Sequence, residues 1–159
     1  MKRPLVPISL LLALLTPLAG KAQPQAQRLW GNVYVGMNAA QLSKMYPHLQ
    51  KFNAIDGGVI LVGPQYRISD GDFTVQFHLK DDALDSVILS AGSPTLINEL
   101  PQATQTYREI KADLTTQYGA PLFSEDSSVF SSNFIQGQRH VALTYMTIIG
   151  KPSITITYG

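Results

Sequence analysis

The sequence contains no cysteine, so several kinds of site are excluded at once. Thiol nucleophiles, and zinc or iron–sulfur sites built on cysteine, all need a side chain that this chain does not have. Disulfides and a cysteine-linked lipid anchor are excluded for the same reason. We therefore expect stability to rest on the packing of a hydrophobic core.

Charged residues are also few, at 14% of the chain. There are 12 Lys plus Arg against 11 Asp plus Glu, and three of the basic residues, Lys2, Arg3 and Lys21, lie within residues 1–22. Without those three, nine remain against 11, a net charge of −2. Nucleic-acid binders carry a basic surface that this composition does not supply, so we expect no nucleic-acid partner.

Motifs for catalysis or metal binding are missing as well. The three histidines, His48, His78 and His140, form no HxH or HExxH pair. Of these, His78 and His140 fall on predicted strands and would meet only if those strands were neighbours. Ser93 lacks the G-x-S-x-G elbow of serine hydrolases. We expect no catalytic residues, no metal and no cofactor, although an enzyme of unrecognised type acting on an envelope polymer remains an alternative.

The N-terminal segment has the pattern of a secretory signal peptide. Two basic residues precede an apolar run over residues 5–18, and the small residues Gly20 and Ala22 follow it. We expect cleavage after Ala22, a flexible spacer over residues 23–28, and a single domain over residues 29–159. This predicts a periplasmic protein, or alternatively a secreted one, with no stable membrane anchor after cleavage.

The first half of the domain predicts one short helix and three strands. Asn38 is expected to cap a helix with Gln41 in a capping box, Met37 to pack on Leu42, and Pro47 to end the helix. Strands are expected over residues 65–68, 73–80 and 84–90. The pair Asp70-Gly71 favours a type I′ hairpin, and alternation from Phe73 to Leu79 favours one buried face.

The second half repeats this order of elements. An amphipathic helix is predicted over residues 102–118, with Tyr107 and Tyr118 on its apolar side and Gly119 at its C-terminus. Strands are predicted over residues 127–135, 138–149 and 153–158. The sequence thus predicts an α+β domain, in which a helix-then-three-strands pattern occurs twice. Both helices would pack on one face of an antiparallel sheet, and the other face would be polar.

The segment Val35-Gly36-Met37-Asn38, followed by a short helix and then hairpins, resembles the opening of SmpA/OmlA outer-membrane proteins. The order of helix and sheet units is also similar to the β-lactamase inhibitor protein fold. The likeness covers residues 33–47, and the chain lacks the lipid-acceptor cysteine of the SmpA/OmlA pattern. What the resemblance implies is a small binding domain of the bacterial envelope.

Possible contact residues fall into three groups. Trp30 marks a protein contact if tyrosines such as Tyr46 or Tyr66 join it on an exposed face. Asp81, Asp82 and Asp85 could face a basic partner. Thr155 and Thr157 lie on the last predicted strand, which would offer free backbone groups if it formed a sheet edge.

These groups favour a non-enzymatic module that binds another protein of the cell envelope, such as an inhibitor, immunity or adaptor protein. A small-molecule or lipid carrier, with a cavity between helices and sheet, is a second alternative.

Overall fold

The computed structural model describes residues 27–92, 100–126, 129–148 and 150–159. The predicted signal peptide and most of the predicted spacer lie outside these residues. The first elements are β1 (Arg28–Trp30), β2 (Val33–Tyr34), α1 (Ala39–Met45), β3 (Gln50–Asn53), β4 (Val59–Ile68), β5 (Gly71–Lys80) and β6 (Ala83–Gly92). They are followed by α2 (Leu100–Tyr118), β7 (Phe123–Asp126), β8 (Phe130–Gln136), β9 (Arg139–Ile148) and β10 (Lys151–Tyr158).

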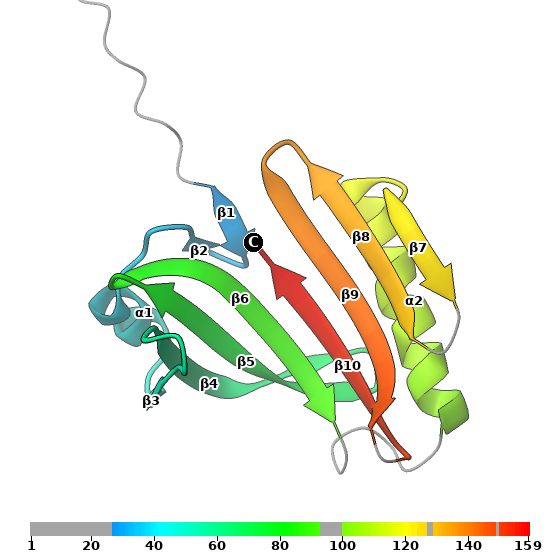
Figure 1. Ribbon diagram of the computed structural model, residues 1–159, viewed down its shortest axis with the longest axis horizontal. Helices are drawn as coiled ribbons and strands as arrows, with labels where there is room; N and C mark the ends of the chain where they lie inside the picture. The colour runs from blue at the N-terminus through cyan, green and yellow to red at the C-terminus, as the bar shows by residue number, and fades with distance from the viewer. Residues whose placement is uncertain (1–26, 93–99, 127–128, 149) are drawn as a thin grey trace, which may run out of the picture.

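The fold is an α+β structure built around one large antiparallel sheet, as Figure 1 shows. Eight strands lie in the order β3-β4-β5-β6-β10-β9-β8-β7, and β1 and β2 form a separate pair. The α+β class and the antiparallel sheet are therefore confirmed. The predicted unit of a helix and three strands does not describe the chain, because four strands follow each helix and β1 and β2 precede α1.

Residues 153–158 do not form a sheet edge, which was the condition under which Thr155 and Thr157 would offer free backbone groups. They belong to β10, which lies between β6 and β9 in the middle of the sheet. Thr155 is opposite Ser90 on one side and Thr144 on the other. The edges are β3 and β7, two strands of four residues each. Thr155 and Thr157 therefore offer no free backbone groups at a sheet edge.

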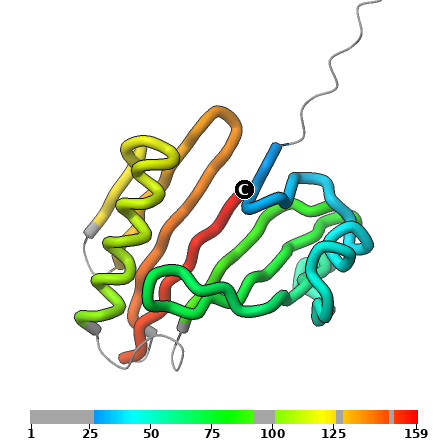
Figure 2. The backbone as a smooth tube through the Cα atoms, turned by 180° about the vertical axis from the view of Figure 1, so that it is seen from behind, coloured from blue at the N-terminus to red at the C-terminus, as the bar shows by residue number. Residues whose placement is uncertain are grey.

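One face of the sheet carries the hydrophobic core, and both helices lie on it. The ring of Tyr107 on α2 lies 6.1 Å from that of Tyr145 on β9. Tyr46, at the end of α1, lies 5.0 Å from Phe77 on β5. Figure 2 shows the two helices on this side. The face is made by Phe73, Val75 and Phe77 of β5, Val87, Leu89 and Ala91 of β6, Val141, Leu143 and Tyr145 of β9, and Ile154, Ile156 and Tyr158 of β10.

The predicted core is confirmed, and its two ends are covered by different helices. Phe73, Phe77, Ile110 and Leu114 are all buried in one cluster. However, α2 contacts β8, β9 and β10, whereas Phe77 on β5 packs against Tyr46. The opposite face, turned to the viewer in Figure 1, is not covered by any described element. Its side chains, such as those of Thr74, Gln76 and Ile88, are half-buried among their neighbours.

Local capping signals determine the start of α1 and the end of α2. The Asn38 side chain accepts a 2.9 Å hydrogen bond from the Gln41 backbone N–H, and the Gln41 side chain accepts one of 2.9 Å in return. Met37 packs against the core cluster that contains Leu42. At the end of α2, Gly119 has a φ of +85°, which only glycine adopts without strain.

The hairpin turn predicted at Asp70-Gly71 is displaced by one residue. Gly71 already pairs with Ile68, so the turn consists of Ser69 and Asp70. Ser69 has a φ of 50°, whereas Asp70 is not among the residues of positive φ. The type I′ pattern occurs instead at the next turn. There Asp81 and Asp82 both have positive φ, 51° and 60°.

The helices described by the structure include none that is both long and apolar enough to cross a bilayer.

Candidate binding cleft

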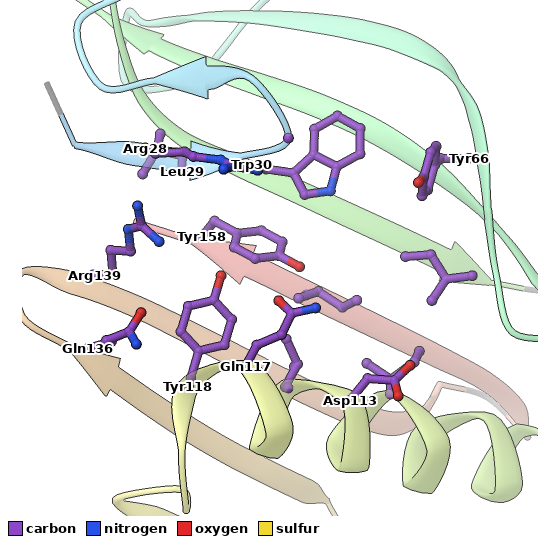
Figure 3. Close-up of a pocket in the computed structure, with 15 residues that line it drawn as sticks. Arg28, Leu29, Trp30, Tyr66, Asp113, Gln117, Tyr118, Gln136, Arg139 and Tyr158 are labelled. Carbon is purple, nitrogen blue, oxygen red and sulfur yellow. The ribbon is translucent and has the colours of Figure 1, made fainter.

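A cleft of about 440 Å³ opens on the helix-covered side of the sheet, as Figure 3 shows. β10 forms its floor, α2 forms one wall, and β1 with the end of β4 forms the other. The hairpin between β8 and β9 closes one end. Its lining includes the charged, amide and aromatic side chains of Arg28, Trp30, Tyr66, Asp113, Gln117, Tyr118, Gln136, Arg139 and Tyr158.

β1 brings Arg28 and Trp30 to the cleft. Arg28 is exposed, Trp30 is half-buried, and Leu29 between them is buried in the core cluster; the pairing of β1 with β2 shifts register between Arg28 and Trp30. The Gln27 side-chain amide donates hydrogen bonds to the backbone oxygens of Gln138, at 3.0 Å, and Gly159, at 3.3 Å. These bonds hold the start of β1 against the β8–β9 hairpin and the end of β10. Residue 28, predicted as spacer, is therefore part of the folded domain.

A β-bulge in β4 brings Tyr66 to the cleft. Val62 pairs with Gln76, but the next pair is Gln65 with Thr74, so β4 contains one extra residue at this point. Each added residue reverses which face the following side chains occupy. The bulge therefore places Tyr66 opposite Phe73, on the core side. The bulge lies at Gly63 and Pro64, residues that are typical of such irregularities.

The α2 wall and the β10 floor present polar groups over an apolar base. Asp113 and Gln117 are exposed on α2, and Tyr118, predicted to be core, is only half-buried and lines the cleft. On the floor, burial raises the pKa of Tyr158, and the phenols of Tyr118 and Tyr66 raise it further. The Tyr158 hydroxyl is therefore neutral at physiological pH and serves as a hydrogen-bond donor or acceptor.

Trp30 is the centre of an aromatic cluster beside the cleft. Its ring stacks on Tyr46, with centroids 6.3 Å apart, and meets Tyr66 edge-on at 5.3 Å. Tyr46 in turn rests on the buried ring of Phe77. A second hollow of about 430 Å³ lies on this side of Trp30, lined also by Met45. Tyr66 is exposed, whereas Trp30 and Tyr46 are half-buried and pack against the core cluster, so whether this cluster is a contact site stays a prediction.

One end of the cleft is positively charged. Arg28 and Arg139 both line it, and Gln136 lies beside them in Figure 3. Neither arginine forms an ion pair with a described residue; the ion pair of 3.3 Å between Arg67 and Asp72 lies outside the cleft. An unpaired guanidinium presents several N–H donors in a plane and suits a carboxylate or phosphate.

The other predicted contact residues lie away from the cleft. Asp81 and Asp82 form the exposed turn between β5 and β6, and Asp85 is exposed at the start of β6. Thr155 and Thr157 are half-buried on the uncovered face of the sheet. The structure thus brings Trp30 to the cleft and keeps the two other groups apart from it and from each other.

The histidines are also kept apart. His78 is on β5 and His140 is on β9, with β6 and β10 between these strands. Burial lowers the pKa of His78, while Asp56 and Asp85 oppose this effect. Within residues 27–92, 100–126, 129–148 and 150–159, no three His, Asp or Glu side chains are grouped as metal ligands would be.

Sequence reasoning missed most of the cleft. Arg139 and Gln136 flank the turn at Gly137-Gln138. Predicting that they lie near Arg28 would have required knowing that β1 lies against this hairpin. Predicting that Tyr66 lies in the cleft would have required recognising the extra residue at Gly63-Pro64. That dipeptide was the one signal in the sequence that could have suggested a bulge.

Comparisons with known proteins give no relative: no family model matches the chain, and neither does any curated protein or solved structure. The resemblance to SmpA/OmlA and β-lactamase inhibitor proteins therefore stays a prediction.

Proposed function

We propose that the protein is an exported, non-enzymatic binding module whose partner is another protein of the cell envelope. The observation that carries this proposal is the accessible aromatic cluster of Trp30, Tyr46 and Tyr66 at the edge of a cleft. Trp, Tyr and Arg are the residues most enriched among those that dominate binding energy in protein interfaces. Here all three types line one hollow.

The shape of the cleft also supports a protein partner over an enclosed cargo. The cleft lies on the surface between α2 and β1 and shares lining residues, Trp30 among them, with the second hollow. Carrier pockets bury most of the surface of their ligand. A surface cleft with a polar rim instead suits a segment that stays attached to a larger partner, with its aromatic centre excluding water.

The uncovered face of the sheet is a second candidate surface. Paired residues form a row of hydroxyl side chains across five strands, and Thr155 is its middle member. A flat array of hydroxyl groups with interspersed apolar residues can accept and donate hydrogen bonds over a wide area. The row consists of Thr74, Ser90, Thr155, Thr144 and Ser131.

Site-specific photo-crosslinking in the native envelope distinguishes the two surfaces. A photoreactive amino acid at Tyr66 reports on the cleft, and one at Thr144 reports on the uncovered face. We expect a discrete cross-linked protein from position 66 and none from position 144. The reverse result would move the binding surface to the uncovered face.

Replacing Trp30 with alanine should weaken binding of the cross-linked partner by about 30-fold or more, the loss typical of a central interface residue. Titration calorimetry with the purified partner measures this. Phe123→Ala is the matched control, because Phe123 is a half-exposed aromatic residue on β7 outside the cleft. An equal affinity for wild type and Trp30→Ala would contradict the proposed site.

Export rests on residues 1–22, which lie outside the described residues. We expect the protein recovered from its natural source to begin at Gln23 and to appear in the periplasmic or secreted fraction. Intact-mass measurement of that fraction checks this. Recovery of the protein in the membrane with residues 1–22 attached would contradict it.

A further inference from the structure

The cleft and the second hollow adjoin at Trp30, and the two together are called the path. The two hollows share Arg28, Trp30, Gly31 and Tyr66, so a ligand that fills one is in contact with the walls of the other. Their volumes are about 440 and 430 Å³. A path of this kind suits an extended chain better than a compact molecule.

The two ends of this path differ in chemistry. Arg139 and Gln136 lie at one end and line only the first cleft, whereas Arg28 lines both hollows; neither arginine has an ion-pair partner among the described residues. The other end is formed by Met45, Tyr46 and the face of Trp30. One end therefore favours an anion, and the other favours an apolar or aromatic group.

The middle of the path offers groups that suit a peptide backbone. The Gln117 amide has both a donor and an acceptor, and so do the hydroxyls of Tyr118 and Tyr158. Figure 3 shows these three side chains beside one another in the cleft. Asp113, the acidic residue of the lining, lies further along α2, away from the arginines in Figure 3. Its charge therefore does not compensate theirs by direct pairing.

We propose that the cleft binds an extended segment of the partner protein that carries a carboxylate, held by Arg139 and Arg28, and an apolar side chain that packs on Trp30. This inference rests on the proposed function and adds the chemistry of the bound segment. A planar guanidinium can engage both oxygens of a carboxylate, which fixes the direction in which the segment lies.

A displayed library of random linear peptides, selected on the protein as its host produces it, tests the proposal. We expect the selected peptides to combine an acidic residue with an aromatic or large aliphatic one. Each selected peptide is then synthesised with its acidic residue and with the corresponding amide. Against wild type, the amide version should bind about tenfold or more weakly, the effect of losing a charge-assisted hydrogen bond.

Variants of the protein show which residues recognise the carboxylate. The double variant Arg28→Gln and Arg139→Gln should bind the acidic and amide peptides equally, because both guanidiniums that would hold the carboxylate are gone. Arg108→Gln is the matched control, since Arg108 is exposed on α2 and does not line the path. It should distinguish the two peptides as wild type does. Thermal unfolding of each variant verifies that it is folded.

Three results would overturn the inference. The first is that no peptide is selected, and the second is that wild type binds the acid and amide peptides equally. The third is that the protein binds only an oligosaccharide of uronic acids, which is used as a second probe. Peptide binding by Trp30→Ala distinguishes an error in the proposed carboxylate from an error in the position of the site. If Trp30→Ala abolishes binding while acid and amide peptides bind wild type equally, the site stands and the carboxylate is wrong. If Trp30→Ala binds like wild type, the site itself is wrong.

Discussion

Replacing Phe77 with alanine should lower the free energy of unfolding by about 3–5 kcal/mol. Phe77 is fully buried in the middle of β5, between Leu61 on β4 and Val87 on β6. Alanine would lose the transfer free energy of the ring and leave a cavity. The surroundings can fill it only in part, because the core around Phe77 is close-packed. Denaturant unfolding followed by circular dichroism measures the change.

Gln76→Ala is the control for this experiment. Gln76 directly precedes Phe77 on β5, is half-buried, and points to the uncovered face. Its truncation should alter stability by no more than about 0.5 kcal/mol. Equal losses at positions 76 and 77 would mean that both faces of the strand are buried. The assignment of an uncovered face would then be wrong.

Phe77 also connects stability to the candidate site. Its ring supports Tyr46, and Tyr46 stacks on Trp30. Loss of the Phe77 ring should therefore let the aromatic cluster shift, and partner binding should weaken even under conditions where the variant is folded. The affinity of Phe77→Ala, measured well below its unfolding temperature, checks this coupling.

Features governed by neighbouring residues were predictable from the sequence. The capping box at Asn38 depends on a residue only three positions away. The alternation from Phe73 to Leu79 follows from the burial of one face of the strand. The turn at Ser69-Asp70 was misplaced by one residue, since Asp-Gly is equally compatible with a turn and with a strand start. Local rules fix the type of an element more firmly than its ends.

Features governed by distant pairing were not predictable in the same way. Thr155 belongs to the centre of the sheet because β10 pairs with β6, from the other half of the chain. No local pattern encodes that partner. The strands β3 and β7 were missed because each has four residues and no alternation of buried and exposed side chains.

The candidate site shows the same division. Trp30 could be singled out as the one tryptophan of the chain, near the start of the predicted domain. The arginines could not, because Arg28 and Arg139 converge only when β1 lies against the β8–β9 hairpin. Tyr66 depends on a single extra residue in β4 that moves it to the core side. A site assembled from β1, β4, α2 and β10 is thus a product of the tertiary fold.

The position of β10 leads to the second large effect. Thr155→Pro should lower the free energy of unfolding by about 3 kcal/mol or more and abolish the cooperative transition if the domain is only marginally stable. Thr155 has a paired strand on each side, with Ser90 and Thr144 opposite it. Proline has no N–H, so one ladder hydrogen bond is lost and its acceptor, inside the sheet, is left without a partner. The proline ring also crowds the adjacent strand.

Thr155→Val separates this backbone effect from the loss of the hydroxyl. Valine has nearly the same shape as threonine and a high preference for strands, so it should unfold within about 1 kcal/mol of wild type. Thermal and denaturant unfolding of both variants measure the contrast. If Thr155→Pro instead kept wild-type stability and lost only partner capture, β10 would have to be an edge after all. Such a result is incompatible with two paired neighbours, since a proline in the middle of a sheet disrupts the ladder whichever neighbour its lost N–H faced.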